Sequence, residues 1–188
     1  IMFDIAIIGG GVIGLSIARE LSKSGFETIV LEKNDRTGED TTSRNSGVIH
    51  AGIYYPKNFL KTSLCTKGNK MLYEYAVEKK INHKNYGKYI IATSEPEEKK
   101  LESLFQQAKK NNVEVHEVNK EEVLEKNPGL IFKKAIFSPT TGVIDVPEYV
   151  TALEGDIQHF GGLISCRTSF LKSKKENDNF IIDCESEE

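Results

Sequence analysis

The feature that most restricts the fold of this 188-residue chain is a glycine motif close to its N-terminus. The motif is Gly9-x-Gly11-x-x-Gly14, between an apolar run over residues 3–8 and a segment over 12–24 with helical apolar spacing. A second apolar run over residues 28–31 ends at Glu32. This order predicts a strand, a helix and a second strand, folded as a right-handed β-α-β unit with parallel strands.

The glycine motif stands in the context that binding of a dinucleotide requires. Gly9 permits a tight turn, Gly11 lets the backbone approach a pyrophosphate, and Gly14 lets the helix pack closely on the strand. Glu32 is placed to accept hydrogen bonds from the adenosine ribose, and an acid there disfavours the 2′-phosphate of NADP. The motif alone does not separate FAD from NAD, and the alternative for Glu32 is a surface acid that follows a chance glycine turn.

The composition excludes several other classes of protein. Lys and Arg total 25 against 28 for Asp and Glu, so the chain lacks the basic excess of a nucleic-acid binder. No apolar run approaches the roughly 18 residues that span a bilayer, and the first residues lack the basic region of a secretory signal. The three cysteines have no metal-type spacing, and their odd number disfavours a disulfide framework. We therefore expect no metal site, no transmembrane segment and a reducing, cytoplasmic setting.

A second informative stretch covers residues 41–55, which read TTSRNSGVIHAGIYY. Its polar part, at residues 43–47, offers hydrogen-bond donors and a close backbone approach to an anionic cofactor. It runs directly into Val48, Ile49 and His50. Such a segment could pass from a pyrophosphate to a flavin ring and place His50 over the reactive edge. From spacing alone, a structural turn residue explains His50 as well.

The rest of the pattern predicts further helices and strands. We expect helices over 59–80, 97–111, 119–126 and 145–160, and strands over 88–93, 113–118, 163–166, 170–173 and 180–184. The helix that begins at Asp145 is the best defined, because Asp145 is an N-cap, Pro147 lies in the first turn and Glu148 completes a capping box. The Lys and Glu runs over 95–126 are expected to be solvated helix faces.

These motifs resemble those of a known family. With Ala18 and Gly25, the glycine motif extends to a longer pattern that is similar to the FAD-binding N-terminus of the D-amino-acid-oxidase-like flavoprotein superfamily. Residues 45–55 closely resemble the signature of the L-2-hydroxyglutarate dehydrogenase/oxidase group. The similarity continues at residues 64–65, 72–75, 87–92, 141–145 and 161–162. Related glycerol-3-phosphate-oxidising flavoenzymes have His-Gly-Gly where this chain has His50-Ala51-Gly52, which favours the hydroxyglutarate group.

The resemblance implies an α/β fold: a Rossmann-like FAD-binding domain with a parallel sheet, plus part of an α+β substrate domain with an antiparallel sheet. We expect the FAD-binding domain over residues 1–80, part of the substrate domain over 81–145, and a return to the FAD-binding domain over 146–188. Flavoenzymes of this kind are considerably longer. The resemblance therefore also implies that the C-terminal half of the fold is absent and that the chain is incomplete and inactive alone.

The resemblance implies noncovalently bound FAD, with His50 as the general base. A histidine suits this role near neutral pH. The other histidines, His83, His116 and His159, are expected at the surface. The expected FAD-binding residues are Gly9, Gly11, Val12, Ile13, Gly14, Glu32, Lys33, Thr42, Ser43, Arg44, Asn45, Ser46, Gly47 and Phe170. Core packing explains Phe170 equally well.

A dicarboxylate substrate also needs cationic or hydroxyl partners. The candidates are Tyr54, Tyr55 and Lys88, with Arg44 also available. The tyrosines are equally explained by packing at a domain junction, and Lys88 by a solvated strand end.

The predicted function is therefore FAD-dependent oxidation of a small 2-hydroxy acid, with L-2-hydroxyglutarate to 2-oxoglutarate as the first choice. One alternative is a glycerol-3-phosphate or amino-acid oxidase or dehydrogenase of the same superfamily. An alternative of another class is a non-catalytic nucleotide-binding fragment. The sequence does not specify the oligomeric state or the electron acceptor, for which oxygen and quinone are the candidates. A quinone route would place the cytoplasmic protein peripherally at the inner membrane.

Overall fold

The computed structural model describes residues 2–186, which form two compact units. The first unit comprises the chain up to Ser46 and again from Asp145 onward, and the second unit is Gly47–Ile144. Residues 47–80, expected in the FAD-binding domain, thus belong by their contacts to the second unit. The reason is strand pairing and helix packing within that unit, where Val48 lies opposite Val143 and Asn69 bonds to the backbone of Thr140.

The first unit is built on a parallel sheet with strand order β1-β2-β9. Its strands are β1 (Ile5–Ile8), β2 (Thr28–Leu31) and β9 (Leu163–Ser165). Helix α1 (Val12–Lys23) connects β1 to β2, and helix α5 (Val146–His159) precedes β9. The predicted β-α-β unit with parallel strands is confirmed.

Helices α1 and α5 pack against each other within the first unit. The buried apolar residues Leu15 and Ala18 come from α1, and Leu153 and Ile157 come from α5. Helix α5 begins as predicted, because the side chain of Asp145 accepts a hydrogen bond from the Glu148 nitrogen at 2.9 Å.

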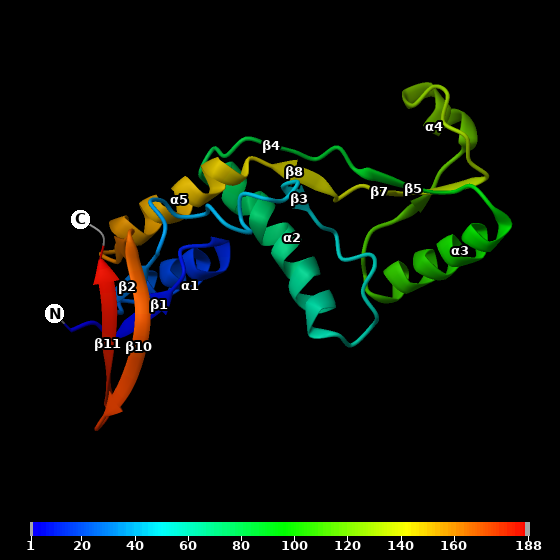
Figure 1. The fold of residues 1–188 in the computed structure, drawn as a ribbon. Helices are drawn as coiled ribbons and strands as arrows, with labels where there is room; N and C mark the ends of the chain where they lie inside the picture. The colour runs from blue at the N-terminus through cyan, green and yellow to red at the C-terminus, as the bar shows by residue number, and fades with distance from the viewer. Residues whose placement is uncertain (1, 187–188) are drawn as a thin grey trace. The chain divides into compact units, whose positions relative to one another are not determined.

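The first unit ends in an antiparallel hairpin of β10 (Thr168–Glu176) and β11 (Asn179–Ser186) (Figure 1). Both strands are longer than the predicted segments over 170–173 and 180–184. The backbone nitrogen of Thr168 donates to the carbonyl oxygen of Glu32 at 2.8 Å. This bond attaches the start of the hairpin to the residue that follows β2.

The second unit contains two antiparallel sheets. In the first, β8 (Gly142–Ile144) lies between β3 (Val48–Ile49) and β4 (His83–Lys84). In the second, β7 (Lys134–Ser138) lies between β5 (Lys88–Ala92) and β6 (His116–Glu117). Its helices are α2 (Leu60–Glu78), α3 (Glu95–Lys110) and α4 (Lys120–Lys126). The parallel sheet of the first unit and these antiparallel sheets together confirm the predicted fold class.

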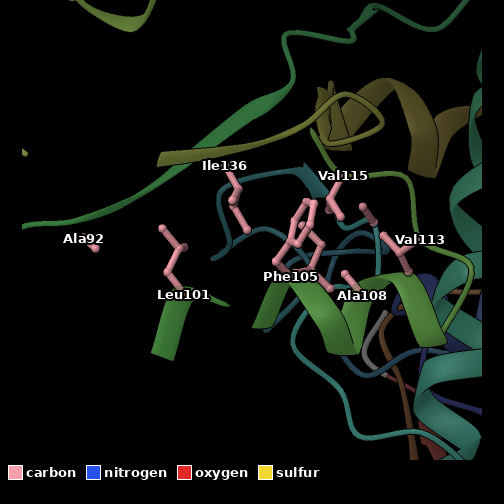
Figure 2. Packing of buried hydrophobic residues seen from close by; sticks show 9 residues of the cluster. Ala92, Leu101, Phe105, Ala108, Val113, Val115 and Ile136 are labelled. Atoms are coloured by element: carbon pink, nitrogen blue, oxygen red, sulfur yellow. The ribbon is translucent and has the colours of Figure 1, made fainter. Parts of the chain in front are cut away.

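The main core of the second unit lies between α3 and the β5-β7-β6 sheet. Figure 2 shows Phe105 and Ala108 of α3 directed toward Val113, Val115 and Ile136. Burial of these apolar side chains is the main force that holds α3 on the sheet. Val113 and Val115 contribute side chains to this core, but their backbone is not paired as a strand. The strand predicted over 113–118 is therefore shorter in the structure, where only β6 (His116–Glu117) forms.

None of the helices that residues 2–186 form is both long and apolar enough to cross a membrane.

Candidate functional site

The glycine turn of the first unit has the geometry that its spacing predicts. Gly9 has φ +104°, a conformation that side chains disfavour. Gly11 is the N-cap of α1, and because it has no side chain it leaves the first N–H groups of the helix to other partners. A Cβ atom at Gly14 would collide with the carbonyl oxygen of Gly9. Close contact between helix and turn therefore requires glycine at this position.

The carboxylate of Glu32 closes the glycine turn from the side of β2. Its Oε2 atom accepts a hydrogen bond from the Gly10 nitrogen at 2.7 Å, and its Oε1 atom accepts one from the Asn34 nitrogen at 2.9 Å. The residue is only 6% exposed. Each carboxylate oxygen can accept a second hydrogen bond. Glu32 can therefore stabilise the turn and bind a ligand hydroxyl at the same time.

The loop after β2 folds back over the N-terminus of α1. The Gly38 nitrogen donates to the Gly10 carbonyl oxygen at 2.9 Å, and the Val12 nitrogen donates to the Thr42 hydroxyl oxygen at 3.1 Å. Thr42, which we expected to bind the cofactor directly, thus occupies the first free N–H of the helix in this structure. A phosphate at this position would compete with the threonine hydroxyl for that donor.

Beside the glycine turn, the first unit contains a cavity of about 680 Å³. It brings together nine of the predicted cofactor residues: Gly9, Gly11, Val12, Ile13, Glu32, Lys33, Thr42, Asn45 and Phe170. The other five predicted residues do not line the cavity. Four of them belong to the first unit, namely Gly14, Ser43, Arg44 and Ser46, and Gly47 belongs to the second unit. Lining residues that we did not predict include Gly38, Glu39, Asp40, Thr41, Thr168 and Ser169. The positive φ of Gly38, +74°, marks the turn that brings this loop to the cavity.

The segment after β3 surrounds a small depression in the second unit, which is too small to hold a water molecule. It is lined by Lys88 and by residues 50–55, which include His50, Tyr54 and Tyr55. The structure thus brings the predicted base and the three predicted substrate residues together. The assignment of Arg44 to the substrate stays a prediction, because Arg44 belongs to the first unit.

Helix α2 fixes the backbone of this depression from one side. Asn69 Nδ2 donates to the His50 carbonyl oxygen at 3.1 Å, and Cys65 Sγ lies 3.5 Å from the same oxygen. Gly52 has φ +88°, and a Cβ atom there would lie 3.1 Å from Cγ2 of Thr66. Gly52 therefore permits the close approach between this segment and α2.

Two amide side chains, one in α3 and one at the C-terminal end of α3, fix the same segment at Tyr55. Gln107 Nε2 donates to the Tyr55 carbonyl oxygen at 3.1 Å, and Asn111 Nδ2 donates to the same oxygen at 2.8 Å. Neither support was predicted from the sequence. Their only sequence signal is a pair of amides four residues apart, which places them on one side of a helix.

The electrostatic environment of His50 favours its neutral form. Partial burial and then the positive charges of Lys88 and Lys61 lower the pKa of His50 below its ordinary value. Lys88 Nζ lies 4.5 Å from the centroid of the Tyr54 ring, and Lys61 Nζ lies 4.6 Å from that of Tyr55. A neutral imidazole is the form that accepts a proton in general-base catalysis.

The other groups with base or nucleophile chemistry are less suited to this role. Burial raises the pKa of the Cys65 thiol, which keeps it protonated at neutral pH. Nδ1 of the half-buried His83 lies 2.7 Å from the Ile81 carbonyl oxygen. His116 and His159 are exposed, as predicted.

The parallel β-α-β unit, its glycine turn and the buried acid beside a cavity define a dinucleotide-binding protein. The sequence profile of the FAD-dependent oxidoreductase (DAO) family matches residues 4–187. The chain belongs to this family, and its cofactor is FAD. The residues fit this cofactor, because Gly9 and Gly11 carry no side chains at the turn that a pyrophosphate would approach and Glu32 retains acceptor capacity for a ribose.

Individual relatives add detail. The chain is 41% identical over 170 residues to a mitochondrial L-2-hydroxyglutarate dehydrogenase of Dictyostelium discoideum, a match that covers 85% of this chain and 37% of that protein. It is 41% identical over 155 residues to a glycerol 3-phosphate dehydrogenase of Caloramator mitchellensis, a match that covers 81% of this chain and 32% of that protein. The chain thus spans roughly a third of the length of these relatives.

A solved structure agrees with the fold. The L-alpha-glycerophosphate oxidase of Mycoplasma pneumoniae, with FAD bound, matches with a TM-score of 0.91 at 26% identity. The match covers 98% of this chain and 50% of that one.

Proposed function

We propose that the enzyme containing this chain oxidises L-2-hydroxyglutarate to 2-oxoglutarate in an FAD-dependent reaction. The observation that carries this proposal is the grouping of His50, whose pKa is lowered, with Lys88 and two tyrosines in the second unit. A 2-hydroxy dicarboxylate needs both a base for its hydroxyl and cations for its carboxylates. The name and 41% identity of the Dictyostelium relative support this substrate over other 2-hydroxy acids.

In the first unit, the cavity residues would hold the adenosine and pyrophosphate portion of FAD. Glu32 would accept hydrogen bonds from the ribose, and the backbone at Gly11 would face the pyrophosphate. Bound FAD supplies the acceptor for the hydride that leaves the α-carbon of the substrate. We also propose contacts with FAD for the other predicted residues of the first unit, which are Gly9, Val12, Ile13, Gly14, Lys33, Thr42, Ser43, Arg44, Asn45, Ser46 and Phe170. The assignment of Gly47 stays a prediction, because Gly47 belongs to the second unit.

In the second unit, His50 would accept the hydroxyl proton at its unprotonated ring nitrogen. Loss of this proton to His50, together with loss of the α-hydride to the acceptor that FAD would supply, would convert the C–O single bond of the substrate to the carbonyl of the 2-oxo acid. Asn69, Gln107 and Asn111 hold the backbone on both sides of the depression, which keeps the imidazole in place. Lys88 would bind a substrate carboxylate.

A second candidate substrate is glycerol 3-phosphate. It is favoured by the name of the Caloramator relative, which has the same 41% identity as the Dictyostelium relative. Ala51 stands where the signature of the glycerol-3-phosphate-oxidising flavoenzymes has a glycine, which argues for the 2-hydroxy acid.

Anaerobic bleaching of the flavin absorption tests the proposal. The purified holoenzyme is mixed with L-2-hydroxyglutarate, with glycerol 3-phosphate or with an L-amino acid in the absence of oxygen. We expect bleaching with L-2-hydroxyglutarate at the lowest concentration of the three. Preferential bleaching by glycerol 3-phosphate would select the second candidate, and a bound flavin that no substrate reduces would indicate a nucleotide-binding role only.

A further inference from the structure

We propose that the beginning of helix α2 and the residues just before it form a surface that docks the enzyme on a membrane containing anionic lipids. Exposed apolar side chains and exposed lysines are interspersed over residues 57–67 of the second unit. We call this surface the basic end of α2, and its residues are Lys57, Phe59, Leu60, Lys61, Leu64 and Lys67. The inference goes beyond the proposed function and does not depend on the identity of the substrate.

The apolar part of the basic end consists of three neighbouring side chains. Phe59, Leu60 and Leu64 are 60%, 74% and 58% exposed. One exposed apolar side chain is common in folded proteins, but here three are close together. Leu60 and Leu64 are four residues apart, so they lie on the same side of α2. Phe59 is the N-cap residue, a position at which small polar residues are preferred, so formation of the helix does not account for it.

The charge of this region differs from that of the chain as a whole. The chain has a net charge of -3 with 28 acidic residues, yet residues 41–73 contain no Asp or Glu. The first turn of α2 contains Lys61 and no acid. A cation is unfavourable there, because the helix dipole places partial positive charge at the N-terminus. Helix stability therefore does not account for the positive charge.

The lysines of the basic end are not neutralised by carboxylates. Within the part of the chain that the structure describes, Lys57, Lys61 and Lys67 form no salt bridge, whereas the next lysine along α2, Lys70, lies 3.8 Å from Glu74. Three cations without counter-ions produce a positive potential over the exposed apolar side chains. This potential is complementary to an anionic surface.

Cations beside an apolar strip are typical of a helix that binds in the interface of a membrane. Phe59, Leu60 and Leu64 would enter the boundary between head groups and acyl chains, and the lysines would remain at the anionic head groups. Glu74 and Glu78 lie further along the side of α2 that carries the leucines, so only the first half of the helix would approach an anionic surface. A nucleic acid would attract the lysines but would leave the exposed leucines in water.

Sedimentation of the purified holoenzyme with lipid vesicles tests the inference. Vesicles of phosphatidylcholine alone are compared with vesicles that also contain phosphatidylglycerol, an anionic lipid. One double variant, Lys57→Gln with Lys67→Gln, removes charge from the basic end. A second double variant, Leu60→Ser with Leu64→Ser, removes apolar surface and leaves the charge unchanged.

Two controls make the same kinds of change elsewhere in the second unit. Lys99→Gln with Lys100→Gln removes two exposed charges from α3. Val77→Ser removes an apolar side chain that is 66% exposed at the other end of α2. The unfolding midpoint and the flavin content of every variant verify that it is folded.

We expect the native holoenzyme to bind the vesicles that contain phosphatidylglycerol and to remain in solution with phosphatidylcholine alone. The lysine double variant should bind the anionic vesicles about 10-fold or more weakly, because each lysine near such a surface contributes about 5-fold. The leucine double variant should also bind about 10-fold or more weakly, because it loses apolar burial. Added salt should weaken native binding, and both controls should match the native protein.

Several results would overturn the inference. They are no binding of the native holoenzyme to anionic vesicles, equal binding to both kinds of vesicle, and an equal loss in the controls. Native affinity in the leucine double variant would show that charge alone attracts the protein, which also contradicts docking through the apolar strip. Reduction of the flavin by L-2-hydroxyglutarate without lipid is measured separately. Its failure in the native holoenzyme would refute the proposed function and leave the membrane inference intact.

Discussion

The Oε2 atom of Glu32 lies 2.7 Å from the backbone nitrogen of Gly10, so the acid at the end of β2 accepts a hydrogen bond from the glycine turn after β1. These residues are 22 positions apart, and the bond between them is buried. The turn that would receive the pyrophosphate and the acid that would receive the ribose are therefore parts of one hydrogen-bonded structure. A change at Glu32 affects both.

Replacing Glu32 with Gln should weaken FAD binding and stability together. The glutamine amide has only one oxygen, so its NH₂ group must face either the Gly10 or the Asn34 nitrogen, and one buried donor loses its acceptor. We expect a cost of about 1–3 kcal/mol in the free energy of unfolding and a raised dissociation constant for FAD. Chemical denaturation and fluorescence titration of the apoprotein with FAD measure these quantities. A variant whose denaturation midpoint equals that of the native protein would contradict this prediction.

Replacing Gly14 with Ala should damage the first unit, because the added Cβ atom collides with the carbonyl oxygen of Gly9. The backbone of the turn must shift, so we expect about 1–3 kcal/mol of destabilisation and reduced flavin content after purification. Gly155→Ala is the matched control, since Gly155 lies in α5 and an added Cβ atom there would meet open space. That control should be neutral or stabilise by up to about 1 kcal/mol. Equal flavin content in the two variants would rule out the steric role of Gly14.

The pH dependence of flavin reduction should report on His50. Its pKa is lowered, so the protonated, inactive form accumulates only at acidic pH, and kcat/KM should rise with pH through a midpoint below the ordinary value of about 6.5. Lys88→Gln removes a positive charge that disfavours the imidazolium, so it should move this midpoint upward. Stopped-flow absorption over a range of pH gives both midpoints. A downward shift in the variant would show that Lys88 does not act on the base.

The packing of helix α1 on helix α5 should depend on a partly buried ionic hydrogen bond. Arg19 Nε donates to Asp156 Oδ2 at 2.6 Å, and the side chains are 16% and 8% exposed. Asp156→Asn retains the shape but removes the charge, and we expect a loss of about 2 kcal/mol in the free energy of unfolding. Denaturant titration measures this loss. The exposed pair Lys172–Asp183 is the control, and Asp183→Asn there should change stability by less than about 0.5 kcal/mol.

Features encoded locally could be predicted from the sequence. The β-α-β unit, the glycine turn, Glu32 and the N-cap at Asp145 depend on short spacings, and the structure forms each of them. Strand β7 was missed, because its apolar run of Ala135, Ile136 and Phe137 is short, and it becomes a strand only by pairing with β5 more than forty residues earlier.

The site was predicted in the same uneven way. The structure brings together His50, Tyr54, Tyr55 and Lys88, which were predicted from a contiguous signature and a nearby strand, and their roles stay predictions. Gln107 and Lys61 were missed, because their contacts with Tyr55 arise only after α2 and α3 pack beside that segment. The unit boundary after Ser46 was also missed, since the pairing of Val48 with Val143 joins positions far apart in the chain.

Single-turnover reduction of the flavin by L-2-hydroxyglutarate, with and without His50, tests the proposed chemistry most directly. We expect the native holoenzyme to be reduced rapidly, the His50→Ala variant to be slower by about 100- to 10,000-fold, and the surface control His116→Ala to match the native rate. Flavin content should be equal in all three proteins. A His50→Ala variant that is reduced at the native rate, or a native holoenzyme that L-2-hydroxyglutarate does not reduce, would contradict the proposed function.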